Sequence, residues 1–160
     1  STPKPSSAAS DVYKRQNLSN GTNAQEDIFF KNTKLLPLIC FESTFPSLLK
    51  SNVENEIIIN ISNDGWFGKS LAPYQHLQIT QIRALEFNRY ILRAANTGLS
   101  AVINNNGKIT KYIPINKEGV ITGFVPINLD TSFYSRYGDI FILMLLFLTL
   151  LSQGLSRLRT

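Results

Sequence analysis

Residues 56–68 read EIIINISNDGWFG, a run of β-branched residues that passes directly into a polar loop with two glycines. A short apolar run of this kind is typical of a strand buried on both faces of a layered sheet. Upstream, KLLPLI at 34–39 predicts a second buried strand that runs into Cys40, and PSLLK at 46–50 predicts a short helix between the two strands. Strands joined through helices predict an α/β fold.

The remainder of the chain continues the same alternation of strands and helices. The longest helix is predicted over residues 73–90, where apolar side chains cluster on one side and Pro73 stands at the start. Asn106-Gly107 is a two-residue signal for a β-hairpin. Four further strand patterns, separated by turn residues, cover 91–95, 100–103, 108–113 and 120–125.

Charge and cysteine content exclude several classes of protein. The net charge is +5, but most of the excess lies in the first 16 and the last four of the 160 residues. A protein that reads nucleic acid concentrates Lys and Arg on a folded face, so we expect no nucleic-acid partner. A single cysteine, Cys40, excludes an internal disulfide, and with a single histidine, His76, it leaves too few ligands for structural zinc. We therefore expect no metal and no cofactor.

Both ends of the chain differ in composition from its middle. The stretch DVYKRQ at 11–16 resembles the translated end of a sequencing adaptor, so residues 1–16 are predicted to be a non-native lead-in. The stretch IFILMLLFLTLL at 140–151 contains no charge, and the apolar pattern around it covers residues 137–158. This length predicts a transmembrane helix. A hydrophobic core helix is the alternative, because polar residues interrupt its second half.

Cys40 is the first candidate for chemistry, because it follows a predicted buried strand in LICFES. A thiolate at a strand end can be approached by a substrate, and the backbone N–H of Phe41 can stabilise a developing oxyanion. The alternative is a small buried hydrophobic residue. Glu42 could orient a base or cap the following helix. Nothing in the sequence brings His76 to Cys40, so a solvated or core-edge histidine is expected there.

The loop NDGWFG at 63–68 is the second candidate region. It follows a buried strand and precedes a helix, a position in which α/β proteins place functional loops. A plain turn capped by Asn63 and Asp64 is one interpretation. Because Trp66 and Phe67 are large apolar residues in a loop, the other interpretation is that these four residues line a substrate pocket.

Five segments, in this order, resemble the C-terminal part of the apolipoprotein N-acyltransferase family, a membrane branch of the nitrilase (carbon-nitrogen hydrolase) superfamily. The segments are LLPLICFES at 35–43, IIINISNDGWFG at 57–68, QHLQITQIRALEFNRYILRAANTG at 75–98, SAVINNNGKI at 100–109 and TSFYSRYGD at 131–139. Their order and spacing, followed by the apolar tail, carry the resemblance.

The resemblance implies an α-β-β-α sandwich with a Glu-Lys-Cys triad, mounted on membrane helices on the periplasmic side of the bacterial inner membrane. Residues 17–136 would then form the C-terminal half of the nitrilase-like domain, followed by one transmembrane helix at 137–158. By the same resemblance Cys40 is the nucleophile, which takes an acyl chain from a phospholipid as a thioester. It passes this chain to the N-terminal amino group of a diacylglyceryl-modified apolipoprotein. Glu42 matches a supporting glutamate, and Trp66 matches an aromatic residue near the lipid-facing pocket.

Two departures from the family pattern affect these expectations. The family usually has tyrosine after the cysteine, where this chain has Phe41. The family's general-base Glu and its Lys lie well upstream of the cysteine, and only 39 residues precede Cys40, so the chain by itself is expected to be inactive. Two other functions remain open from the sequence: a soluble nitrilase-type amidase, and a catalytically degenerate scaffold tethered to a membrane.

Overall fold

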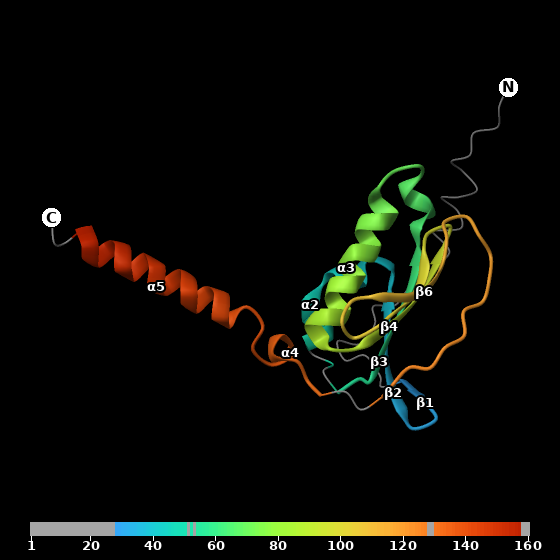
Figure 1. Cartoon of the computed structure of the whole chain (residues 1–160), viewed down its shortest axis with the longest axis horizontal. Helices are drawn as coiled ribbons and strands as arrows, with labels where there is room; N and C mark the ends of the chain where they lie inside the picture. Colours follow the sequence, from blue (N-terminus) through green and yellow to red (C-terminus); the bar gives the residue numbers. More distant parts are fainter. Residues whose placement is uncertain (1–27, 51, 53, 128–129, 158–160) are drawn as a thin grey trace, which may run out of the picture.

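Six strands form one mixed sheet in the order β1-β2-β3-β4-β5-β6 (Figure 1). The computed structural model describes residues 28–50, 52, 54–127 and 130–157, so the predicted lead-in at 1–16 lies outside the described residues. Strands β2, β3 and β4 are mutually parallel, and the outer pairs are antiparallel. The strands are β1 (Ile28–Phe30), β2 (Thr33–Ile39), β3 (Ile57–Asn63), β4 (Tyr90–Asn96), β5 (Ser100–Ile103) and β6 (Ile109–Ile113).

Two crossover connections join the parallel strands. The 3-10 helix η1 (Cys40–Thr44) and helix α2 (Pro46–Lys50) lead from β2 to β3, and η2 (Asp64–Phe67) and helix α3 (Ala72–Phe87) lead from β3 to β4. Because both crossovers advance across the sheet in the same direction, the right-handed rule places α2 and α3 on the same face, as Figure 1 shows. The carboxyl ends of three parallel strands therefore meet at one edge of the sheet.

The hydrophobic core lies between this face of the sheet and the helices. Strand residues of alternate position point into it, as the two-residue period of a strand requires. Full burial of each large apolar side chain contributes about 1.5–3 kcal/mol. The buried apolar residues are Leu36, Leu38, Leu49, Ile58, Leu77, Ala84, Phe87, Ile91, Ala101 and Ile103.

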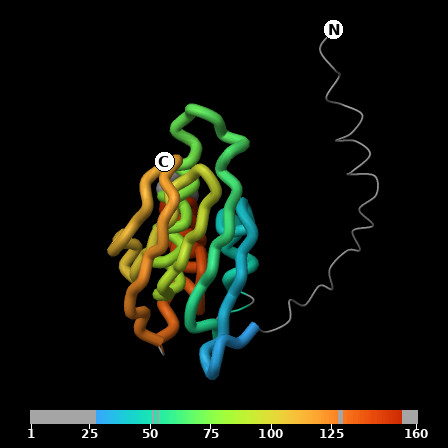
Figure 2. Tube along the Cα trace, turned by 90° about the vertical axis from the view of Figure 1, so that its right-hand side faces the viewer, coloured from blue at the N-terminus to red at the C-terminus, as the bar shows by residue number. Residues whose placement is uncertain are grey.

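The opposite face of the sheet is less well covered. The strand prediction for 56–61 is confirmed, but burial on both faces is wrong within the described residues: Ile58 is buried, whereas Ile61 is exposed. Residues 114–127 run across this face without helix or strand (Figure 2). Together with the sheet they line an open groove of about 340 Å³, to which Ile59 and Val120 contribute. The described layers thus form one helix layer and one sheet of the sandwich that the resemblance implies.

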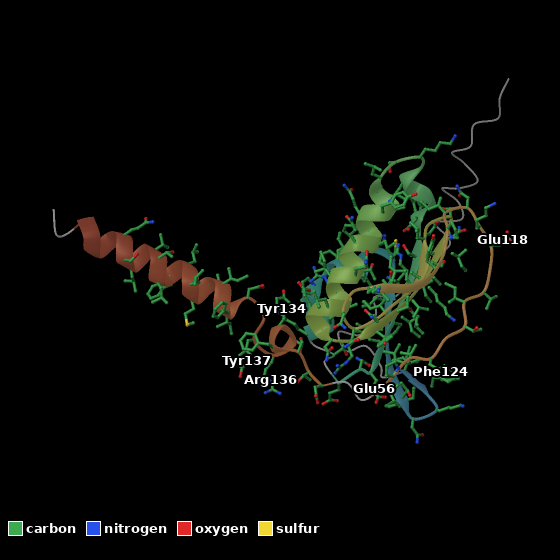
Figure 3. All side chains as sticks on the ribbon, viewed as in Figure 1. Glu56, Glu118, Phe124, Tyr134, Arg136 and Tyr137 are labelled. Atoms are coloured by element: carbon green, nitrogen blue, oxygen red, sulfur yellow. The ribbon has the colours of Figure 1, made fainter. Side chains whose placement is uncertain are left out.

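Two predicted boundaries need correction. Residues 120–125 form no strand: Val120 is 90% exposed, and Phe124 lies fully exposed on the segment that crosses the sheet (Figure 3). The alternation of apolar residues over 120–125 therefore does not mark a strand that is buried by pairing with the sheet. The long helix ends at Phe87 rather than at residue 90, because Asn88 adopts a left-handed conformation with a φ of 52° and so terminates α3.

The C-terminal part consists of two helices. Helix α4 (Phe133–Tyr137) ends at Gly138, which has a φ of 58°, so the helix predicted from residue 137 onward is interrupted there. Helix α5 (Ile140–Arg157) then leads away from the sheet (Figure 1). Within the described part of the chain, no helix is long and apolar enough to cross a membrane. The transmembrane helix predicted over 137–158 is therefore not supported, and residue 158 itself lies outside the described residues.

Candidate active site

Cys40 stands at the carboxyl end of β2, where the strand passes into η1. Its φ is 51°, in the left-handed region that non-glycine residues rarely adopt. Such a conformation costs about 1–3 kcal/mol and persists only where surrounding contacts hold it. The side chain is half-buried and forms no disulfide. The backbone therefore turns sharply at the residue that the sequence singles out as a nucleophile.

The two residues after Cys40 have different environments. Glu42 accepts a hydrogen bond from the backbone N–H of Ile39 through Oε2, at 2.6 Å, which is the capping arrangement that the sequence leaves open. The Phe41 side chain is exposed, and its ring centroid lies 5.9 Å from that of His76. The oxyanion role of the Phe41 N–H stays a prediction, as does a supporting catalytic role for Glu42.

Asp64 is only 2% exposed, so it does not face an open substrate pocket. Its Oδ1 accepts a hydrogen bond from Ser62 Oγ at 2.7 Å and lies 3.1 Å from His76 Nδ1, and its Oδ2 accepts from Arg93 Nη2 at 2.8 Å. Burial alone would raise the pKa of the Asp64 carboxyl, but the Ser62 hydrogen bond, the Arg93 charge and the contact with His76 together hold it below its usual value. Asp64 is therefore an ionised group inside the protein.

Arg93 of β4 neutralises this buried carboxylate. Its side chain is completely buried, and besides Asp64 it donates to the side-chain oxygen of Asn60 and, at 3.5 Å, to Thr80 Oγ1. Asn60 of β3 in turn donates from Nδ2 to the backbone carbonyl of Cys40, at 3.2 Å. The cluster thus extends from the ion pair to the backbone of the candidate nucleophile.

His76 also reaches Cys40, through the backbone rather than the thiol. This histidine of α3 is 3% exposed, so it is a core-edge residue and not a solvated one. Its Nε2 lies 3.2 Å from the Cys40 carbonyl oxygen. The Cys40 Sγ instead lies 3.6 Å from Ser62 Oγ, whose own proton goes to Asp64, so that the thiol S–H is the group left to donate between the two. Helix α3 packs on η1, which brings together residues 36 positions apart in the chain.

The other residues of the 63–68 loop form its turn and its surface. Asn63 Oδ1 accepts from the backbone N–H of Gly65 at 3.1 Å, as the plain-turn interpretation predicts. Phe67 packs edge-on against the His76 ring, with centroids 6.0 Å apart. Trp66 is 79% exposed. The loops after β2 and β3 expose further large apolar side chains, and we call this set the apolar rim: Ile39, Phe41, Phe45, Trp66 and Leu71.

Sequence reasoning missed three residues of this site. Asn60, Ser62 and Arg93 are polar residues at core-facing positions of otherwise apolar strands. A buried polar side chain needs a partner, so polar residues in such runs are a signal that could have indicated a buried cluster. No group of three or more His, Cys, Asp or Glu side chains suited to a metal ion occurs among the described residues.

The chain is an α/β protein with parallel central strands and a cysteine in the left-handed conformation at a strand end, and comparison with known proteins identifies the family. Residues 2–132 match the family model of the carbon-nitrogen hydrolases, and the chain belongs to this family. A carbon-nitrogen hydrolase structure from Helicobacter pylori superimposes with a TM-score of 0.56 at 15% identity, over 62% of this chain and 43% of that one. That likeness shows the fold.

Curated relatives of the chain are apolipoprotein N-acyltransferases. The protein of Rickettsia bellii is 42% identical over 118 residues, which are 72% of this chain and 24% of the relative. The protein of Pasteurella multocida is 37% identical over 141 residues, 87% of this chain and 27% of the relative. The chain therefore spans about a quarter of the length of the relatives that it matches.

Proposed function

We propose that the chain is part of an apolipoprotein N-acyltransferase in which Cys40 is the nucleophile. The acyl donor is a phospholipid, and the acceptor is the N-terminal amino group of a diacylglyceryl-modified apolipoprotein. The strained Cys40 at the carboxyl end of β2, beside an exposed apolar rim, is the observation that carries the proposal.

The reaction divides into two acyl transfers. In the first, the Cys40 thiolate attacks the ester carbonyl carbon of the phospholipid, the C–S bond forms, the ester C–O bond breaks, and the leaving lysophospholipid oxygen takes a proton from the general base. In the second, the amine attacks the thioester, the C–N bond forms, the C–S bond breaks, and the amine proton returns to the base. Two easier steps replace one difficult transfer. The Phe41 N–H is the proposed oxyanion donor in both.

The triad Glu and Lys are proposed to come from the remainder of the full-length protein. Within the described part of the chain, the hydrogen-bond partner of the Cys40 Sγ is the hydroxyl of Ser62, and neither a carboxylate nor an amine bonds to it. A thiol needs a base and a positive charge to become an efficient nucleophile. We therefore expect the 160-residue chain by itself to be inactive.

The apolar rim favours a lipid substrate over a small amide. Its residues, Trp66 and Phe41 among them, expose apolar surface at the edge of the sheet where Cys40 lies. Exposed apolar surface beside a polar site is typical of lipid or membrane contact. Because the donor is a membrane lipid and the acceptor is a lipid-modified protein, we propose that the reaction takes place at the bacterial inner membrane, with the catalytic domain on the periplasmic side. Asn63 and Phe67, beside the rim, remain candidates for the substrate pocket.

The test uses the full-length protein in vesicles of phosphatidylethanolamine and phosphatidylglycerol. Wild type should transfer an acyl chain to a diacylglyceryl-cysteine peptide, and the mass of the protein should show a hydroxylamine-sensitive acyl adduct. Cys40→Ala should abolish transfer and adduct, whereas Ser47→Ala, an exposed change on nearby α2, should abolish neither. Absence of both transfer and adduct in wild type would support a degenerate scaffold, and transfer that persists in Cys40→Ala would overturn the role of Cys40 as the nucleophile. Hydrolysis of short amides without transfer to the peptide would support an amidase.

A further inference from the structure

The strained backbone of Cys40 is held through its carbonyl oxygen. That oxygen accepts a hydrogen bond from Asn60 Nδ2 at 3.2 Å and lies 3.2 Å from His76 Nε2. A left-handed conformation persists only where such contacts fix it. Asn60 comes from β3 and His76 from α3, so two separate elements meet at one peptide group. Both side chains are buried.

The surroundings of His76 decide which ring nitrogen carries the proton. The Cys40 carbonyl oxygen can only accept, so at 3.2 Å it requires a proton on Nε2. Ser43 Oγ donates to the same carbonyl oxygen at 3.4 Å and lies 3.4 Å from Nε2, so it is left to accept from Nε2–H. The opposite nitrogen, Nδ1, lies 3.1 Å from both Asp64 Oδ1 and Arg93 Nη2. It accepts from Arg93 in the neutral ring and donates to Asp64 in the charged ring, and Nε2–H is present in both states.

We propose that His76 and Asn60, oriented by the buried pair of Asp64 and Arg93, are positioning residues that hold Cys40 in the conformation from which its thiol attacks. This inference rests on the proposed role of Cys40 as the nucleophile. The hydrogen bond of His76 to Cys40 runs to the carbonyl oxygen and not to the thiol. The His76 Nε2–H fixes the peptide plane after Cys40, and Asp64 and Arg93 fix the imidazole ring. Neither histidine nitrogen acts as the general base.

Two amide variants of His76 separate this role from a merely structural one. In His76→Gln the side-chain N–H₂ falls near the former Nε2 and can still donate to the Cys40 carbonyl. In His76→Asn the amide falls near the former Nδ1 and keeps the contacts with Asp64 and Arg93, but the donor to Cys40 is lost. If His76 only supports the fold through Asp64 and Arg93, Asn should preserve acyl transfer better than Gln. If His76 holds the Cys40 carbonyl, Gln should preserve acyl transfer better than Asn.

The measurement is the steady-state transfer of acyl chains by the full-length protein in the vesicles described above. His76→Asn should lower kcat about tenfold with KM unchanged, as expected for the loss of one hydrogen bond that orients the nucleophile, and His76→Gln should stay within about threefold of wild type. Equal losses in both variants, or a larger loss in Gln, would overturn the inference. Loss of transfer in Cys40→Ala alone, with both His76 variants fully active, would overturn the inference and leave the proposed function standing.

A second measurement needs no variant. His76 is the single histidine of the chain, so an imidazole nitrogen spectrum of the ¹⁵N-labelled protein reports on it without assignment. We expect the Nε2 signal of a protonated nitrogen, because Nε2 faces the Cys40 carbonyl oxygen, and a proton that exchanges slowly because the ring is buried. A neutral ring protonated at Nδ1 would contradict the geometry, whatever the role of Cys40 proves to be.

Discussion

The substitution Asp64→Asn tests the buried charge cluster directly. It keeps the size of the side chain, so no cavity forms, but it removes the only carboxylate that hydrogen-bonds to the Arg93 guanidinium among the described residues. The remaining partners of Arg93, which include Asn60 and Thr80, are neutral. The variant therefore contains a buried cation without a counter-charge.

The expected loss is large for one substitution. Removing one member of a buried ion pair costs about 3–5 kcal/mol, because the charge left behind is neither solvated nor neutralised. Since a folded domain is stable by about 5–15 kcal/mol, this loss is about a fifth or more of the total free energy of unfolding. The control Glu118→Gln removes an exposed carboxylate (Figure 3) and should change the free energy of unfolding by less than about 0.5 kcal/mol.

The assay is urea unfolding of the chain in a non-ionic detergent, followed by circular dichroism at 222 nm. The double variant Asp64→Asn, Arg93→Met should lose less than the two single variants added together, by about 1–3 kcal/mol, because no unpaired charge remains. If Asp64→Asn unfolds at the same urea concentration as Glu118→Gln, the ion pair does not support the fold and the reasoning is refuted.

Three further predictions concern single positions. A Cβ at Gly98 would lie 2.1 Å from Asp64 Oδ2, so Gly98→Ala should destabilise the chain by about 1–3 kcal/mol, whereas Gly119→Ala, with its nearest neighbour at 3.4 Å, should cost less than about 1 kcal/mol in the same urea assay. The pKa of Asp64 is lower in the folded chain than in the unfolded chain, so its contribution is fully present above about pH 4 and is lost as the pH falls. Wild type should consequently lose stability faster than Asp64→Asn when urea titrations are repeated from pH 4 down to pH 2. Asn88 has a φ of 52°, and Asn88→Val should melt lower than Asn88→Gly by the equivalent of about 1–2 kcal/mol, a difference that thermal unfolding would measure.

Local periodicity was sufficient to predict the central elements of the fold. The strands that contain 34–39 and 57–61 and the short helix at 46–50 follow from patterns within a few residues, and the structure confirms them. The hairpin between β5 and β6 is also confirmed, but its turn is not the predicted two-residue one: it runs from Asn104 to Gly107, with Gly107 at the last position. The position of Cys40 at a strand end was predicted in the same way. These features depend on neighbours in the sequence, because the period of the side chains and the geometry of a tight turn are local properties.

Pairing and burial could not be predicted from the same patterns. The short strand Ile28–Phe30 exists because β2 offers it an antiparallel edge, whereas the equally apolar 120–125 finds no such edge in the described structure. The interruption at Gly138 and the absence, within the described residues, of a helix able to cross a membrane likewise contradict the apolar pattern of 137–158. Hydropathy reports which side chains avoid water but not which partner covers them.

The candidate site shows the same division. Cys40, with its thiol chemistry, and the loop at 63–68 can both be recognised as candidates from the sequence alone. Only the parallel pairing of β3 and β4 sets Asn60 and Arg93 beside each other, and only the packing of α3 on η1 carries His76 to the Cys40 carbonyl. A buried ion pair is stable only when carboxylate and guanidinium meet within hydrogen-bonding distance. That condition joins residues far apart in the chain, and tertiary structure alone can satisfy it.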